Sequence, residues 1–300
     1  MHYVITGSLG NIGKPLATQL VEAGHSVTVI SSKQDRIKAI EKIGAKAAIG
    51  SISDTKFLTG TFTGADAVFT MVPPNFDVKD WKGYIGGIGR NYVIAVSNAG
   101  VKHVVNLSSI GAHMREGCGP VSGLYRVEQA FDDLHDVNVR HLRAGYFYTN
   151  FLNSINSIRD EGVIRGNFGK NTMIVLVHPS DIADEAAKEL TEPSFLGKGY
   201  RYIVSDEKTT NQIASILGES IGRPDLQWID LSDEEMMAGM IRSWIPEEIA
   251  RNYVEMGAAM RSGEMLSDYE DHRPVFSGWR SIDKFTPEFA EAFGALSITM

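Results

Sequence analysis

The stretch that indicates the fold lies near the start of the chain and reads Val4-Ile5-Thr6-Gly7-Ser8-Leu9-Gly10-Asn11-Ile12-Gly13-Lys14-Pro15. A short β-branched run leads into three glycines spaced three residues apart, and an amphipathic helix follows, ending near Gly24. A second strand, Val27–Ile30, completes a β–α–β unit. Unpaired N–H groups and the positive end of the helix dipole meet at such a turn, so it predicts a site for a dinucleotide pyrophosphate.

The three glycines have separate expected tasks. We expect Gly7 to permit the sharp turn off the strand, Gly10 to let a pyrophosphate approach the backbone, and Gly13 to let the helix pack on the strand. The alternative is a glycine-rich turn that binds nothing. The loop residues expected to contact the cofactor are Gly7, Leu9, Gly10, Asn11, Ile12 and Gly13.

Composition narrows the classes of protein that the chain can represent. A net charge of −8 and a pI near 5.5 argue against a nucleic-acid surface, which needs a basic stripe. The single cysteine, Cys118, excludes an internal disulfide framework and fits a reducing compartment. The first strand begins by Tyr3, which leaves no room for a signal peptide, and no apolar run is long enough to span a membrane. We expect a cytoplasmic protein.

Strand-like and helix-like segments alternate through the first half of the chain. This alternation predicts parallel strands with right-handed crossovers, and hence an α/β, doubly wound Rossmann sheet. Residues 1–150 are expected to form the NAD(P)-binding Rossmann domain, with roughly 171–205 returning to it. Residues 206–300 are expected to form a smaller, mainly helical cap or substrate domain, in which the charged run Ser267–Arg273 is a solvated loop.

The end of the second strand bears on the choice of cofactor. NAD-specific units usually place a carboxylate there for the ribose hydroxyls, but this chain has Ser31–Ser32–Lys33 with Arg36 one helical turn later. Hydroxyls and cations suit a 2′-phosphate, so NADP(H) is preferred over NAD(H). The alternative is that Lys33 and Arg36 only begin a solvated helix.

Two further strand ends should lie at the same edge of the sheet, where open α/β sheets bind ligands. The first ends in Met71, Val72 and Pro73, which we expect to wall the nicotinamide. The second ends in Ser108 and Ser109, whose hydroxyls either reach the cofactor or cap the next turn.

The motif Thr6-Gly7-x-x-Gly10-x-x-Gly13 resembles the extended and atypical short-chain dehydrogenase/reductase superfamily. Within it the chain looks like the NmrA-like branch, which includes quinone and azo-dye reductases, isoflavone-reductase relatives and a redox-sensing regulator. The resemblance covers roughly residues 1–225, with departures at Ser51 and Ala144. It rests on Gly50-Ser51-Ile52-Ser53-Asp54, Val104-Val105-Asn106-Leu107-Ser108-Ser109, Leu142-Arg143-Ala144-Gly145-Tyr146-Phe147-Tyr148-Thr149-Asn150 and Pro179-Ser180-Asp181-Ile182-Ala183.

The acid–base pair of the mainstream superfamily, Tyr-x-x-x-Lys, is absent. The one nearby tyrosine, Tyr125, has Gln129 four residues on, and no lysine stands between Lys102 and Lys170. This excludes an epimerase or dehydratase that depends on the pair. Tyr125 is therefore expected to position a substrate by one hydrogen bond, or to be a packed aromatic.

Other candidate site residues are few. Tyr146 follows a strand that should end beside the nicotinamide, so it is expected either to contact the cofactor and a flat aromatic substrate or to pack under the cap. His113, without an acidic partner in the sequence, reads as a surface histidine. No spacing of His, Cys or carboxylates indicates a metal site.

Two functions follow from these observations. The first is an NAD(P)H-dependent oxidoreductase that passes hydride to a quinone-like or related flat acceptor, with a small molecule as its partner. The second is a non-catalytic sensor that binds the dinucleotide and a protein. The missing lysine fits both, and homo-oligomer formation stays open.

Overall fold

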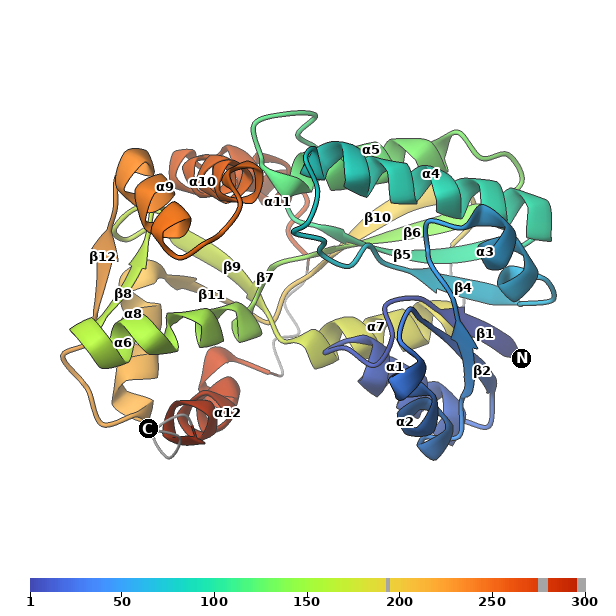
Figure 1. Cartoon of the computed structure of the whole chain (residues 1–300), viewed down its shortest axis with the longest axis horizontal. Coiled ribbons are helices and arrows are strands. Elements are labelled where there is room, and N and C mark those ends of the chain that lie inside the picture. The colour runs from blue at the N-terminus through green and yellow to red at the C-terminus, as the bar shows by residue number, and fades with distance from the viewer. Residues whose placement is uncertain (193–194, 275–279, 296–300) are drawn as a thin grey trace.

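A computed structural model of the chain describes residues 1–192, 195–274 and 280–295. Seven parallel strands form the main sheet, in the order β10-β6-β5-β4-β1-β2-β3 (Figure 1). The order reverses beside β1, which is the topological switch point of a doubly wound sheet. The strands are β1 (His2–Ile5), β2 (Ser26–Ser31), β3 (Lys46–Ile49), β4 (Ala67–Thr70), β5 (His103–Ser109), β6 (Asn138–Ala144) and β10 (Lys198–Ile203).

Helices cover both faces of this sheet, as expected for parallel strands joined by crossovers. One face carries α1 (Gly13–Glu22), α2 (Ile37–Lys42) and α7 (Pro179–Thr191), with the 3₁₀ turn η1 (Gln34–Arg36) between the first two. The other carries α3 (Thr55–Phe62), α4 (Trp81–Ala99) and α5 (Pro120–Asp132). Figure 1 shows α4 and α5 above the sheet and α1 and α7 below it. The predicted α/β Rossmann fold is confirmed.

A second lobe lies beyond the carboxyl edge of the main sheet (Figure 1). Its two small sheets have the orders β11-β9-β7 and β12-β8. The strands are β7 (Tyr146–Phe147), β8 (Val163–Gly166), β9 (Met173–Val177), β11 (Asp206–Thr209) and β12 (Gln227–Asp230). The helical elements are η2 (Tyr148–Ser154), α6 (Ile155–Glu161), α8 (Thr210–Ser220), α9 (Asp233–Arg242), α10 (Glu247–Ser262), η3 (Glu264–Leu266), α11 (Ser267–Asp271) and α12 (Ile282–Ala295).

The chain crosses between the lobes more than once. Segment 171–205, which we expected to return to the Rossmann domain, is divided between them. Its first strand, β9, pairs with β7 and β11 in the second lobe, whereas α7 packs on α1 and β10 pairs with β6 in the main sheet. Hydrophobicity alone cannot separate these two destinations, because both strands are partly or fully buried.

Capping sequences at helix ends predict structure more specifically than hydrophobicity does. The sequence spacings Thr209-x-x-Gln212 and Ser232-x-x-Glu235 predict capping boxes, and both form. The side chains of Thr209 and Ser232 accept from the backbone N–H at the third helical position, and the side chains of Gln212 and Glu235 accept from the backbone N–H of the N-cap residue. One expectation was wrong. The predicted loop Ser267–Arg273 contains α11, because Tyr269 is fully buried behind a mostly charged sequence.

Among the described helices, none is both long and apolar enough to cross a bilayer.

Candidate functional site

The glycine loop after β1 has a backbone that few residue types can adopt. Gly7 has a φ of +91°, and a Cβ there would lie 2.2 Å from the Sδ atom of Met71. Ser8 also has a positive φ of 58°, and its N–H donates to the carbonyl of Ile30 at 3.0 Å. This bond ties the loop to the end of β2, so the turn is fixed before any ligand arrives.

The other two glycines differ from each other. A Cβ at Gly13 would lie 2.1 Å from the carbonyl oxygen of Ser8, so Gly13 is needed by the turn itself rather than for packing on the strand. A Cβ at Gly10 would meet only the Gly7 carbonyl oxygen, at an ordinary 3.6 Å. The backbone at Gly10 is therefore open on the side where a ligand can approach.

The N-terminus of α1 is free to receive an anion. Its N-cap residue, Ile12, makes no side-chain hydrogen bond, and the first turn holds no acidic residue. The first N–H groups of a helix have no intrahelical acceptor, and the dipole adds partial positive charge there. The glycine loop and this helix end thus fit a pyrophosphate.

A hollow of about 250 Å³ opens beside the loop. It joins the loop to the end of β2 and to η1, and so brings together residues that the sequence placed in two separate motifs. Ser8, which we did not single out, belongs to it, and its hydroxyl donates to Ser31 Oγ at 3.1 Å. The lining residues are Gly7, Ser8, Leu9, Gly10, Ser31, Ser32, Lys33 and Arg36.

The cations of this hollow are exposed and unpaired. Lys33 and Arg36 have no ion pair within residues 1–192, 195–274 and 280–295. The backbone N–H of Lys33 donates to the buried Ser31 hydroxyl at 3.2 Å, which sets the position from which the lysine leaves the strand. Such a group offers charge and hydrogen bonds to a phosphate.

Of the remaining loop residues, one is buried in the core of the Rossmann sheet and another contacts the second lobe. Ile12 is buried in the apolar core under the sheet. Asn11 reaches toward the second lobe, where its amide lies 3.5 Å from the hydroxyl of Thr149. The loop therefore touches both lobes.

The end of β4 is fixed from two sides. The N–H of Met71 donates to Thr6 Oγ1 at 2.9 Å, and the Tyr92 hydroxyl donates to the Met71 carbonyl at 2.7 Å. Complete burial raises the pKa of Tyr92, so this hydroxyl stays a donor. Met71, Val72 and Pro73 are half-buried next to the glycine loop, as a wall for a flat ring requires.

Tyr146 begins the crossing into the second lobe. Its ring packs against Phe151 and Phe168, with centroid separations of 5.4 and 5.7 Å. Burial raises the pKa of its phenol, so Tyr146 is neutral near pH 7. The preceding Gly145 is closely packed, because a Cβ there would lie 2.7 Å from the Val175 carbonyl oxygen.

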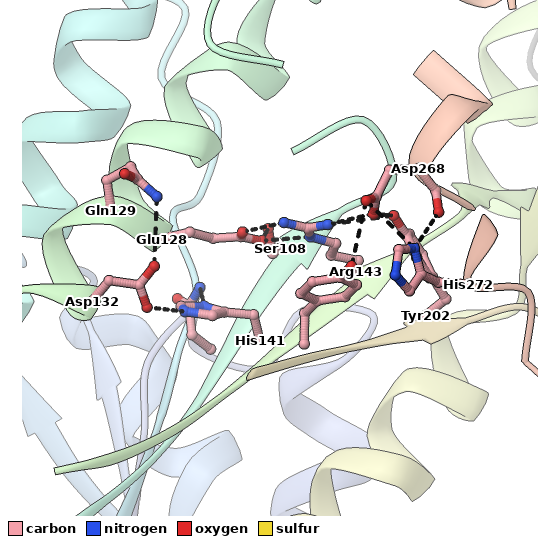
Figure 2. A network of polar contacts seen from close by, with 11 residues as sticks. Ser108, Glu128, Gln129, Asp132, His141, Arg143, Tyr202, Asp268 and His272 are labelled. Carbon is pink, nitrogen blue, oxygen red and sulfur yellow. Dashed lines mark hydrogen bonds and ion pairs between the residues drawn. The ribbon is translucent and has the colours of Figure 1, made fainter. Parts of the chain in front are cut away.

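A buried polar network lies at the end of β5 (Figure 2). The hydroxyl of Ser108 donates to Glu128 Oε1 at 2.5 Å. Arg143 donates to both oxygens of the same carboxylate, from Nε at 3.1 Å and from Nη2 at 2.7 Å. All three side chains are nearly inaccessible to solvent. Ser108 is thus held by Glu128 rather than left to cap a turn.

The network continues into the second lobe. Arg143 Nη1 donates to Asp268 Oδ2 at 2.8 Å, and the Tyr202 hydroxyl also contacts Asp268. The guanidinium carbon lies 3.7 Å from the ring centroid of Tyr200. Arg143 and hydrogen bonding from Tyr202 help to hold the pKa of Asp268 below its usual value against the opposing effect of burial. Sequence reasoning missed Glu128, Arg143 and Asp268 as one group, because they are far apart in the chain.

Tyr125 lies elsewhere. It lines a hollow of about 660 Å³ on the outer side of α4 and α5, together with Arg90, Val93 and Gln129. The structure does not bring Tyr125 into the hollow of the glycine loop. His113 is half-buried and contacts the Ser267 hydroxyl at 3.1 Å, so it belongs to the contact between the loop after β5 and α11.

The described part of the chain holds no group of three His, Cys, Asp or Glu side chains that could bind a metal ion. The fold and the glycine loop define an NAD(P)-binding Rossmann protein. Residues 7–138 match the sequence family described as NAD(P)H-binding. This match to residues 7–138 agrees with the resemblance to the NmrA-like, atypical short-chain dehydrogenases/reductases noted in the sequence.

Relatives of known activity match almost the full length of the chain. The NAD(P)H azoreductase of Xenophilus azovorans is 23% identical over 294 residues, which cover 97% of this chain and 99% of the relative. The NADPH-dependent quinone oxidoreductase of Escherichia coli, solved with NADPH, superimposes with a TM-score of 0.78 at 20% identity, covering 98% and 99% of the two chains. The triphenylmethane reductase of Citrobacter sp., solved with NADP(H), gives 0.79 at 20% identity, covering 96% and 99%.

Proposed function

We propose that this protein is an NAD(P)H-dependent oxidoreductase that transfers hydride to a quinone or a related flat acceptor. The observation that carries the proposal is the preformed anion site. A glycine loop pinned to β2 faces an uncapped helix N-terminus with no acidic residue in its first turn. This arrangement fits a dinucleotide pyrophosphate.

The relatives support the reaction type. An azoreductase, a quinone oxidoreductase and a triphenylmethane reductase share this chain's length, and the last two share its fold. Their names describe the reduction of azo, quinone and triphenylmethane compounds, with NAD(P)H or NADPH named as the cofactor. Such acceptors can take hydride at a polarised carbon or nitrogen with little acid–base assistance, which agrees with the absence of lysine between Lys102 and Lys170.

The bound dinucleotide supplies the hydride, and the chain supplies binding and orientation. The loop N–H groups at the start of α1 hold the pyrophosphate, and Gly10 leaves the space for it. Met71, fixed by Thr6 and Tyr92, sets one wall at the end of β4. Thr6 directly follows β1 and Tyr92 lies on α4, so Met71 is held in place from two packed elements.

We infer a preference for NADP(H) from the hollow between the loop and η1. Ser32, Lys33 and Arg36 are exposed there, and no acidic side chain lines the hollow. A carboxylate would repel a 2′-phosphate, whereas these groups attract it.

We infer that the second lobe, with residues 206–300 as its larger part, supplies the acceptor site. The main chain enters this lobe through β7, where the half-buried ring of Tyr146 lies against the buried rings of Phe151 and Phe168. Flat aromatic rings of this kind pack well against a flat acceptor.

The test is loss of NADPH absorbance in the presence of a panel of simple quinones and one azo dye, with protein-free mixtures as the control. We expect protein-dependent oxidation with at least one quinone. If the protein binds NADPH but oxidises none above the control rate, the reductase proposal is refuted and a dinucleotide-binding sensor explains the chain instead.

A further inference from the structure

A buried negative charge lies directly behind the end of β5. The Glu128 side chain is 6% exposed, and its carboxylate accepts from one hydroxyl and twice from one guanidinium. The same guanidinium also donates to Asp268. Two carboxylates share a single cation, Arg143, so the group carries one net negative charge. Figure 2 shows the line of side chains from Ser108 to Asp268.

The order of the side chains shows which end of this group carries the negative charge. Glu128 Oε1 accepts from both the Ser108 hydroxyl and Arg143 Nε, so the group bonded to the strand-end hydroxyl is the anion and not the cation. The Ser108 hydroxyl donates its only proton to Glu128, which turns its oxygen lone pairs elsewhere. The ring of His272 is 53% exposed and lies 3.5 Å from the carboxylate of Asp268, at the end of the group away from Ser108 (Figure 2). The negative pole therefore faces β5.

The strand order relates this pole to the dinucleotide site. From β2, which carries Ser31 of the adenosine side, the sheet continues through β1 and β4 to β5. Dinucleotides bind across the carboxyl ends of the strands with their two halves on opposite sides of the switch point. The nicotinamide half therefore belongs on the side of β4 and β5, where Ser108 is the next-to-last residue of its strand.

We propose that Glu128, held by Arg143 and acting through Ser108, stabilises the oxidised form of the bound dinucleotide. This inference rests on the proposed function. When a hydride, one proton with two electrons, leaves for the acceptor, the neutral dihydronicotinamide becomes a pyridinium with one positive charge. A fixed anion in a dry site favours that charge without reorganisation. Glu128 is in this sense a positioning and electrostatic residue, and it does not itself exchange a proton.

The test compares the affinities of NADP⁺ and NADPH, measured by calorimetric titration without any acceptor. Glu128→Gln keeps the size of the side chain and one acceptor oxygen for Ser108 Oγ and Arg143 Nε, but it removes the charge. We expect the ratio of the dissociation constants, NADP⁺ over NADPH, to rise about three- to tenfold in this variant, as expected for one unit charge removed several ångströms away.

The matched control is Glu189→Gln. Glu189 is also buried and lies 3.6 Å from Arg140 on the same strand as Arg143, but near the opposite, amino end of β6. The ratio should stay within about twofold of wild type in this variant, because the charge is remote. An equal rise in both variants would overturn the proposal by showing a non-specific effect of a lost charge.

An unchanged ratio in folded Glu128→Gln would also overturn it. Should that variant fail to fold, Asp268→Asn decides the question, since it removes the other carboxylate from the same guanidinium. We expect a rise in the same direction, and no rise refutes the proposal. Failure of the wild-type protein to bind either nucleotide would instead refute the proposed function, on which this inference depends.

Discussion

Asp268 and Arg143 are 125 positions apart in the sequence, yet Arg143 Nη1 donates to Asp268 Oδ2 at 2.8 Å. Arg143 lies on β6 in the main sheet, and Asp268 lies on α11 in the second lobe. The guanidinium is removed from water and bonded on its other side to Glu128. This pair therefore joins the two lobes next to the strand ends that form the candidate site.

Removing the cation should destabilise the protein strongly. In Arg143→Met the side chain keeps much of its apolar length, but Glu128 is left buried without its partner. We expect the free energy of unfolding to fall by about 3–5 kcal/mol. Denaturant unfolding measures this, with Arg165→Met as the control, because the Arg165–Glu161 pair is exposed and should contribute at most about 1 kcal/mol. Equal losses of unfolding free energy in the two variants would contradict the claim that Arg143→Met leaves Glu128 buried without its partner.

Gly10→Val should separate binding from folding. A Cβ at Gly10 has space in the free protein, so we expect a melting temperature close to that of wild type. The branched side chain would occupy the place where a pyrophosphate must approach, so dinucleotide binding should be lost. A melting curve and a binding curve on the same sample test both statements. Normal NADPH affinity in this variant would mean that the cofactor binds elsewhere.

Gly13→Ala, in contrast to Gly10→Val, should destabilise the free protein. Its Cβ would lie 2.1 Å from the Ser8 carbonyl oxygen, so the loop must distort even without ligand. We expect a loss of at least about 1 kcal/mol of unfolding free energy, as is common for overpacking. A variant as stable as Gly10→Val would show that the loop adapts more readily than its geometry indicates.

The cofactor preference is tested by Lys33→Ala. If Lys33 pairs with a 2′-phosphate, NADPH affinity should fall about tenfold, the value of one charge-assisted hydrogen bond, while NADH affinity stays constant. Lys38→Ala is the matched control, because Lys38 is exposed on the neighbouring helix and does not line the hollow. Equal losses for both nucleotides, or tighter wild-type binding of NADH, would refute the preference.

Tyr125→Phe should have little effect on turnover. The structure places Tyr125 in the outer hollow of α4 and α5, so its hydroxyl does not reach the glycine-loop site. We expect the quinone-dependent rate to stay within about twofold of wild type, well short of the loss caused by removing a general acid. An inactive variant would reveal a proton path that passes through α5.

The sequence was informative where structure depends on neighbouring residues. Gly7, Gly10 and Gly13 predicted the loop because strand, turn and helix follow one another within it. The capping boxes at Thr209 and Ser232 were predictable because each consists of two side chains three residues apart. Alternating strand and helix signals in the first half likewise gave the parallel sheet.

Contacts between distant segments could not be predicted in the same way. Asp268 lies in a charged run that predicts a solvent-exposed loop. Only the position of α11 next to Arg143 shows that Asp268 forms an ion pair between the two lobes. Tyr125 was a candidate because it is the one tyrosine near the position of the Tyr-x-x-x-Lys pair, but α5 turns Glu128 toward Ser108 while Tyr125 lines the outer hollow. The role of Ser8 in the loop was not predicted, because serine rarely adopts a positive φ and the neighbouring residues do not indicate one.

The most direct test of the account is a single turnover. NADPH is first bound to the protein, a quinone is then added in excess without oxygen, and the loss of NADPH is followed alongside formation of the hydroquinone. We predict that the two change one for one in the wild-type protein, and that Gly10→Val shows neither change above the protein-free rate. Bound NADPH that stays unoxidised throughout would contradict the assignment of this protein as a reductase.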